Sequence, residues 1–448
     1  MNQPCRPWTN CLPLVAALVG VNLLMPCATS SSPAQASEPA TAAVETVSGL
    51  AAGSSRRLGG TNAAARPTLE RRLPLRLPGE FESQGGLLLG CHELAAHVPE
   101  VFADVVRACG PRVPIVALVR DRHDWQLAQH VLAARSIAAS QLRYVLASHD
   151  TMWARDYGPL IVEQRGGPPL VIDAEYDVDR ARDDRVPSAL SRYLGLALIA
   201  ADLEIAGGNL LSNGQGLCVA TNQLLERNLH RAGDEETLAE RLTELVGCRR
   251  MVLLEPLAGE PTGHVDMFVT FTSANTVVVA SCDAAVDPVN AALLDRNAQR
   301  LAALDTPAGP LEVVRLPLPP HDDGTWRTYT NVVYANGVLL VPIYPGLDAA
   351  GQHRALATFS RLKPHWQVRG IDARRLARLG GALHCVVMNL GPIGALPVGA
   401  APRHAPADTL SPIDDLLLPD DDPFDRLRRD VLAAEPLPLG RGAWPRPW

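Results

Sequence analysis

The sequence predicts an α/β fold built from five similar modules that close into a ring around one site. Apolar stretches of strand length alternate along the chain with amphipathic stretches of helix length. Single polar residues also interrupt apolar surroundings at near-regular positions, namely Asp156, Asn209, Asp266, Asn331 and Cys385. Their successive separations are 53, 57, 65 and 54 residues, and this near-constant period indicates repeated supersecondary units. We therefore expect each module to bring one side chain to a shared centre.

The predicted modules run strand, hairpin, strand, helix, strand. Apolar runs predict strands over residues 87–90, 114–119, 144–147, 170–174, 217–220, 251–254, 277–280, 311–316, 338–342 and 383–388. Helical periodicity predicts helices over residues 99–109, 124–135, 235–245, 288–304 and 348–362. Asn-Gly pairs at 213–214 and 336–337 predict hairpin turns. These hairpins, and the absence of a GxGxxG motif after the first strand, argue against the alternative of a doubly wound parallel sheet.

Residues 1–36 predict an export signal. Arg6 is the only charge before an apolar run over residues 12–25, which is short for a membrane span, and Ala34-Gln35-Ala36 offers small residues for cleavage. A lipid anchor at Cys27 is disfavoured because Pro26 directly precedes this cysteine. We therefore expect a periplasmic or secreted protein with no membrane attachment after cleavage.

The rest of the chain divides into three parts. Residues 37–72 are rich in Ala, Ser, Gly and Thr and predict a flexible leader, and residues 73–395 form the predicted catalytic domain. Residues 396–448 form a Pro-rich acidic extension in which one amphipathic stretch, 423–434, offers a helix that could dock on the body. The net charge of −7, without a basic stripe, excludes a typical nucleic-acid-binding protein.

Cysteine usage favours thiols over a disulfide framework. The chain after the signal keeps an even number of cysteines, Cys91, Cys109, Cys218, Cys248, Cys282 and Cys385. An even number in an exported protein permits disulfides, but most of these residues lie in apolar segments, where a small buried thiol is the simpler interpretation. No CxxC pair occurs. We expect at most one bridge, and Cys385 to be free.

Three residue types suit nucleophilic chemistry on a guanidinium group. Cys385 is a candidate nucleophile, although a buried core thiol is the alternative. His264 and Asp266 alternate with apolar residues, so on a strand both would point to one face, where the histidine suits acid and base work. A surface pair or a metal-ligand pair is the alternative, but no regularly spaced further ligands accompany them. With Asp156, Asp266 would provide two carboxylates, which match the donors of a planar guanidinium.

The ordered motifs MWARDYGP, AGGNLLSNGQG, TGHVDMF, YTNVVYANG and GGALHC resemble the bacterial-type peptidyl-arginine deiminase and agmatine deiminase family of the guanidine-modifying (pentein) superfamily. PGEFESQGG resembles that family's opening segment, and the resemblance covers about residues 77–390. It implies a five-bladed α/β propeller and a mechanism without metal or cofactor. It also implies that Cys385 is the nucleophile, His264 the general acid and base, and Asp156 and Asp266 the guanidinium clamps, with Asn331 as a supporting polar group.

Candidate substrate-binding residues come from the same motifs and from one neighbouring segment. They are Trp153, Arg155, Gly208, Asn209, Arg180 and Arg182. The Arg180/Arg182 pair resembles the pair that binds a terminal carboxylate in the secreted bacterial peptidyl-arginine deiminase. The alternative is that both are surface residues paired with nearby aspartates.

The expected function is an exported deiminase that converts peptidyl-arginine, with C-terminal arginine as one possibility, to citrulline. Agmatine deiminase, which gives N-carbamoylputrescine, is the closest alternative. Ala206 and Asn213 depart from the agmatine deiminase pattern, and so do the residues after Cys385. A Cys-His-Asp amide hydrolase and an inactive binding protein with the same fold are more distant alternatives. The oligomeric state and the natural partner, a peptide, a protein or agmatine, stay open.

Overall fold

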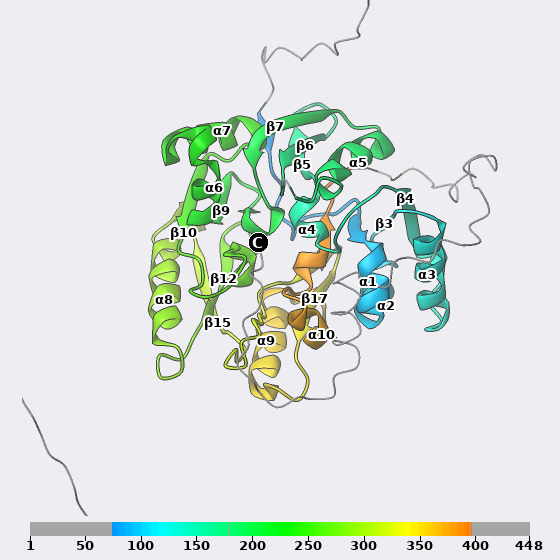
Figure 1. Cartoon of the computed structure of the whole chain (residues 1–448). Helices are drawn as coiled ribbons and strands as arrows, with labels where there is room; N and C mark the ends of the chain where they lie inside the picture. Colours follow the sequence, from blue (N-terminus) through cyan, green and yellow to red (C-terminus); the bar gives the residue numbers. More distant parts are fainter. Residues whose placement is uncertain (1–73, 178, 395, 397–448) are drawn as a thin grey trace, which may run out of the picture. The chain divides into compact units, whose positions relative to one another are not determined.

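The computed structural model describes residues 74–177, 179–394 and 396, which form a mixed α/β fold (Figure 1). Five main sheets and one small ribbon, β13 (Asp305–Thr306) with β14 (Gly309–Pro310), make up its strands. The predicted signal and leader and residues 397–448 lie outside the described residues. Within the described ranges, no helix is both long and apolar enough to cross a membrane.

Four sheets repeat one topology, in which an antiparallel hairpin is followed by helix and then by a strand parallel to the second hairpin strand. The first is β5 (Leu160–Gln164), β6 (Leu170–Glu175), α5 (Val186–Leu194) and β7 (Leu198–Glu204), with β1 (Leu75–Arg76) added beside β5. The second is β8 (Leu211–Ser212), β9 (Leu217–Thr221), α6 (Asn222–Ala232), α7 (Glu235–Val246) and β10 (Arg250–Leu254). The third is β11 (Val269–Ser273), β12 (Thr276–Ser281), α8 (Pro288–Ala302) and β15 (Glu312–Pro317). The fourth is β16 (Val333–Ala335), β17 (Val338–Ile343), α9 (Ala349–Leu362) and β18 (Gln367–Asp372).

The fifth sheet joins the two ends of the described chain. Its order is β19 (Val387–Asn389), β2 (Leu87–Gly90), β3 (Ile115–Val119) and β4 (Leu142–Leu146). β19 pairs antiparallel with β2, and Val387 lies opposite Leu89. The helices α1 (Cys91–His97), α2 (Pro99–Cys109) and α3 (Arg122–Ala133) connect the parallel strands of this sheet. The C-terminal strand therefore takes the place that a hairpin strand has in the other four modules.

A short turn before the first strand of each module carries one of the five regularly spaced polar residues. These turns are α4 (Ala154–Tyr157), η3 (Gly207–Asn209), η4 (Val265–Met267), the segment at Asn331 before β16, and η5 (His384–Val386). α4 contacts both η3 and η5, and η3 contacts η4. The equal sequence spacing thus reflects equivalent positions in successive modules, as predicted.

The helices α3, α7, α8 and α9 lie on the outer side of the sheets in Figure 1, whereas the short α4 lies near the centre. Their boundaries follow from capping chemistry, because aspartates accept a hydrogen bond from the first turn of α3, α7, α8 and α9. α2 buries Phe102, Val105 and Val106 on the face that the sequence predicted. At the β16–β17 hairpin, Asn336 and Gly337 both have positive φ (44° and 93°), as the predicted Asn-Gly turn requires.

Two sequence-based assignments were wrong. His264 and Asp266 were predicted on a strand. Instead, Asp266 lies in the 3₁₀ turn η4, and His264 is the residue that caps this turn. The predicted strand over residues 383–388 is the turn η5 followed by β19. In both cases the tight turn before a module's first strand has apolar residues that mimic a strand pattern. The predicted modular α/β fold itself is confirmed.

Candidate active site

A cavity of about 510 Å³ opens where the turns of the modules meet. Its lining comprises Trp153, Asp156, Tyr176, Asp177, Arg180, Glu204, Ala206, Arg227, Pro261, Thr262, His264, Met267, Leu379, Gly380 and Cys385. Three of the residues predicted to do chemistry, Asp156, His264 and Cys385, therefore face one space although more than 100 residues separate each from the next.

Cys385 contacts the side chain of Asn331. The Cys385 side chain is buried, and the Asn331 Nδ2 donates to its Sγ at 3.5 Å. The Asn331 Oδ1 accepts a hydrogen bond from the backbone N–H of His384 at 2.7 Å, which fixes the turn that carries the thiol. Burial raises the pKa of Cys385 well above its ordinary value, and the Asp266 and Asp156 carboxylates raise it further. Burial and the two carboxylates therefore favour the thiol form of Cys385, and a cation placed beside the carboxylates would favour the thiolate.

Asp156 and His264 line one side of the cavity, and Gly208 lies directly against both. The Asp156 Oδ1 lies 3.4 Å from the His264 Nδ1 and accepts a hydrogen bond from the Gly208 N–H at 3.1 Å. Burial raises the pKa of Asp156, with a further contribution from the nearby Asp266. A Cβ on Gly208 would lie only 2.7 Å from the Asp156 Oδ1 and 2.8 Å from the His264 Nδ1. Only glycine allows the Asp156 and His264 side chains to lie this close to the backbone at position 208.

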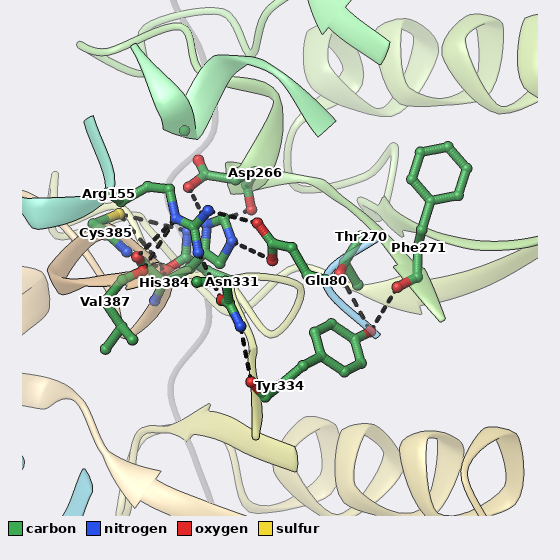
Figure 2. A network of polar contacts seen from close by, with 12 residues as sticks. Glu80, Arg155, Asp266, Thr270, Phe271, Asn331, Tyr334, His384, Cys385 and Val387 are labelled. Atoms are coloured by element: carbon green, nitrogen blue, oxygen red, sulfur yellow. Dashed lines mark hydrogen bonds and ion pairs between the residues drawn. The ribbon is translucent and has the colours of Figure 1, made fainter. Parts of the chain in front are cut away.

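Asp266 has one oxygen engaged and one oxygen free of partners among the described residues. Its Oδ2 lies 2.8 Å from the His384 Nδ1 (Figure 2). Its Oδ1 is buried and has no hydrogen-bond partner in the described structure. Burying a carboxylate oxygen without a hydrogen-bond partner costs free energy, so a ligand that donates a hydrogen bond to this atom would be bound favourably. A guanidinium N–H is such a donor.

Sequence reasoning missed two residues of this site, His384 and Glu80. The His384 Nε2 lies 2.7 Å from the Glu80 Oε2, and the Glu80 Oε1 accepts from the Arg155 Nη1 at 2.5 Å (Figure 2). Both lie inside motifs that the sequence singles out, GGALHC and PGEFESQGG. Nothing in the sequence shows that these motifs, 304 residues apart, meet.

Comparison with known proteins identifies the family. The family model of the Porphyromonas-type peptidyl-arginine deiminases matches residues 76–391. The chain belongs to this family. A crystal structure of a protein from Porphyromonas gingivalis, provisionally named an arginine deiminase, is 26% identical and has a TM-score of 0.62, with 70% of this chain and 98% of that chain covered. The predicted pentein fold and the predicted class, a hydrolase acting on C–N bonds, are thereby confirmed.

Agmatine deiminases are also among the relatives. A Photobacterium profundum protein provisionally named an agmatine deiminase is 22% identical over 361 residues, which cover 70% of this chain and 95% of the relative. The agmatine deiminase of Enterococcus faecalis, solved while catalysing its reaction, is 20% identical with a TM-score of 0.61, and 70% of this chain and 95% of that chain are covered. At this identity the second likeness shows the fold alone.

The other predicted substrate-binding residues of this family member occupy different places. Trp153 lines the cavity and packs over Gly381, where an added Cβ would clash with its ring. Arg155 is buried behind the nucleophile and donates to the carbonyl of Val387 at 3.1 Å, so it faces away from the cavity lining. Asn209 accepts from the N–H of Val265 at 3.1 Å and thereby ties the turns of two modules together.

The two arginines of the predicted carboxylate site are separated in the structure. Arg180 lines the cavity, and its Nη1 donates to the Tyr176 hydroxyl at 3.3 Å. Arg182 is largely exposed, pairs with Asp150 at 3.2 Å, and does not belong to the cavity lining. Instead, Arg227 from α6 lines the cavity and forms an ion pair with Glu204.

Proposed function

We propose that the protein is an exported deiminase that hydrolyses the side chain of arginine in a peptide, with a C-terminal arginine as the preferred form, to citrulline and ammonia. The observation that carries the chemistry is the unpartnered Asp266 Oδ1, buried at a site that also holds Asp156, His264 and Cys385. Two carboxylates beside one thiol match a cation with several N–H donors better than a neutral amide. This pattern disfavours the alternative of an amide hydrolase.

Binding of the guanidinium prepares the nucleophile. The cation offsets the two carboxylates that raise the pKa of Cys385, so the thiol loses its proton more readily, and His264 accepts this proton. The thiolate then forms a bond to the central guanidinium carbon, whose C=N electron pair moves to nitrogen. His264 returns the proton to one nitrogen, and the C–N bond breaks to release ammonia.

Hydrolysis of the covalent intermediate reverses these roles. His264 takes a proton from a water molecule, and the resulting hydroxide attacks the same carbon. The C–S bond then breaks, the ureido product leaves, and Cys385 recovers its proton. One water is consumed and one ammonia is released for each guanidinium. Asp156, His264 and Cys385 line one cavity, and Asp266 lies close enough to Cys385 to raise the pKa of its thiol.

Recognition of a substrate carboxylate rests on Arg180, with Arg227 as a second cation of the cavity lining. The nearest carboxylate of Arg180 is Asp177 at 3.7 Å, beyond ordinary hydrogen-bond length, so its guanidinium keeps donors for a ligand. A carboxylate contact of this kind contributes about 1.5–3 kcal/mol. Arg182, paired outside the cavity, is given no contact with substrate in this proposal.

Agmatine is the second candidate substrate. Asp177 and Glu204 also line the cavity, and either carboxylate could receive the distal ammonium group of agmatine. The agmatine deiminases among the relatives favour the same substrate class. Both candidates share the reacting group and differ only at the far end of the molecule.

A substrate panel tests the proposal. The protein is incubated with free arginine, agmatine, a peptide with internal arginine and a peptide that ends in arginine, and ammonia and ureido product are measured. We expect Arg180→Ala to lower kcat/KM on the terminal-arginine peptide about tenfold to a hundredfold, with little loss on agmatine, and Arg182→Ala to serve as the matched control. A wild-type preference for agmatine over every peptide would overturn the substrate choice. Export is tested by sequencing the N-terminus of the protein recovered outside the cytoplasm, which we expect near Ser37.

A further inference from the structure

We propose that Glu80 and His384 are positioning residues that orient the Asp266 clamp from behind, so that its Oδ1 faces the guanidinium of the substrate. Neither residue belongs to the cavity lining, so each acts through another group. This inference rests on the proposed function of the same site, and it assigns roles to two residues that the mechanism above does not use.

The contacts form one continuous chain of alternating charge, in which only the Glu80 side chain, 21% exposed, reaches the surface. It runs from Arg155 to Glu80, from Glu80 to His384 and from His384 to Asp266, with distances of 2.5, 2.7 and 2.8 Å (Figure 2). The side chains of Arg155, His384 and Asp266 are each no more than 3% exposed. With water excluded at these positions, such hydrogen bonds are stronger and more directional than on the surface.

His384 makes two contacts that only a doubly protonated imidazole can satisfy with carboxylates. Both ring nitrogens face carboxylate oxygens, which accept but do not donate hydrogen bonds when ionised. Burial and the Arg155 cation lower the pKa of His384, but Glu80 and Asp266 more than offset them, so the pKa is raised above its ordinary value. His384 is therefore a cation that holds the Asp266 Oδ2 in place.

Glu80 supplies the fixed end of this chain. Burial raises its pKa, but Arg155 and His384 outweigh this effect and lower the pKa to about 2. The segment around it is anchored independently of the site. The Phe81 ring lies 5.1 Å below the Lys363 ammonium, and the Gln84 backbone N–H donates to the Asn336 side chain at 2.8 Å. A segment that lies outside the five modules thus sets the position of a group that contacts substrate.

Two matched substitutions separate orientation of Asp266 from general packing. His384→Asn keeps a donor near the Nδ1 position, which faces Asp266, whereas His384→Gln keeps a donor near the Nε2 position, which faces Glu80. Each variant is assayed for kcat and KM on the best substrate of the panel, and its melting temperature is measured. His321→Asn is the control, because it removes another histidine that bonds a carboxylate, Asp287, outside the cavity lining.

We expect His384→Gln to lose about 10- to 100-fold in kcat/KM, with kcat lowered as well as KM raised, and His384→Asn to lose several-fold less at a comparable melting temperature. Glu80→Gln should fall between them. Equal losses in both His384 variants would overturn the inference, as would wild-type kinetics in either Glu80→Gln or His384→Gln.

A readout without turnover distinguishes this inference from the proposed function. The ¹⁵N ring signals of His384, assigned by their loss in His384→Asn, should keep the doubly protonated signature at pH 7.5 in the wild type and titrate at lower pH in Glu80→Gln. An ordinary histidine titration in the wild type would refute the positioning chain even if the enzyme is active. A wild type inactive on every substrate, with the expected ring signals, would refute only the proposed function.

Discussion

Replacing Gly208 by alanine should disable the site while leaving the fold intact. A methyl group at this position would lie 2.7 Å from the Asp156 Oδ1, 2.8 Å from the His264 Nδ1 and 3.1 Å from the Asp266 Oδ2. Ordinary contact begins at about 3.4 Å, so these three groups must retreat by about 0.7, 0.6 and 0.3 Å. The substitution therefore moves the proposed base and both clamps at once, through a single added carbon.

The expected loss follows from these displacements. Misplacement of reacting groups by about 1 Å costs roughly a hundredfold in rate, so shifts of this size predict about a 10- to 100-fold drop in kcat/KM. Gly208 does not have a positive φ, so alanine fits its backbone. Because alanine reduces the conformational entropy of the unfolded chain, it should raise the free energy of unfolding by about 0.4–1 kcal/mol. Overpacking costs about 1–3 kcal/mol, and the two effects partly cancel.

Steady-state kinetics and thermal unfolding of Gly208→Ala check this prediction together. Gly167→Ala is the matched control, because its Cβ would meet the side-chain oxygen of Gln164 at a similar 2.8 Å, but on an exposed turn where that side chain can move. Wild-type kcat/KM in Gly208→Ala would refute the geometry of the site. A collapse of the melting temperature would show that the loss arises from the fold rather than from the site.

Four further predictions concern the charged groups and the thiol. Cys385→Ala should abolish turnover at an unchanged melting temperature, and full activity would exclude covalent catalysis by this thiol. Asp156→Asn and Asp266→Asn should each lower kcat/KM by several orders of magnitude, because each removes charge-assisted hydrogen bonds worth about 1.5–3 kcal/mol apiece as well as orientation; an effect confined to KM would argue against contact with the reacting group. Iodoacetamide should alkylate Cys385 of the free enzyme slowly at neutral pH and faster above pH 9, because burial and two carboxylates raise its pKa, and a pH-independent fast reaction measured by mass spectrometry would contradict this. Glu80, whose pKa falls from 4.5 to about 2 on folding, should contribute up to about 3 kcal/mol of stability above pH 4.5 and lose it as pH falls toward 2, so the free-energy difference between wild type and Glu80→Gln should shrink over that range in urea unfolding.

The regular spacing of polar residues in the sequence located most of the site. Asp156, Asn209, Asp266, Asn331 and Cys385 occupy equivalent turns, one before the first strand of each module. A repeated unit must place equivalent residues at equivalent points, so the period survives in sequence even where the residue types differ. The helices α2, α3, α7, α8 and α9, which begin at proline or follow a capping aspartate, were also predicted, because local chemistry determines where they start. The strands β7 and β18 were not predicted, although β7 is seven residues long and β18 six.

The parts that the sequence could not predict depend on contacts between distant segments. The role of Arg155 follows from its burial behind β19 rather than from its motif. Arg180 and Arg182 point to different places because Asp150 forms an ion pair with Arg182 only. α6 escaped prediction because its sequence, NQLLERNLHRA, is mostly polar and buries only Leu224, Asn228 and Ala232. Tertiary context decided each of these cases.

Closure of the fifth sheet explains why the nucleophile and its supporting charges come from opposite ends of the domain. Cys385 lies on the turn directly before β19, and β19 is held by three paired residues of β2. Arg155 also holds β19 in place. Its buried guanidinium donates to the Val387 carbonyl and the Asn389 side chain of β19, and to Glu80 of the N-terminal segment. Pairing of β19 with β2 therefore fixes the thiol close to the segment that carries Glu80. Without this pairing the other turns would still carry both clamps and the histidine, but η5 would not hold the nucleophile beside them, because it directly precedes β19.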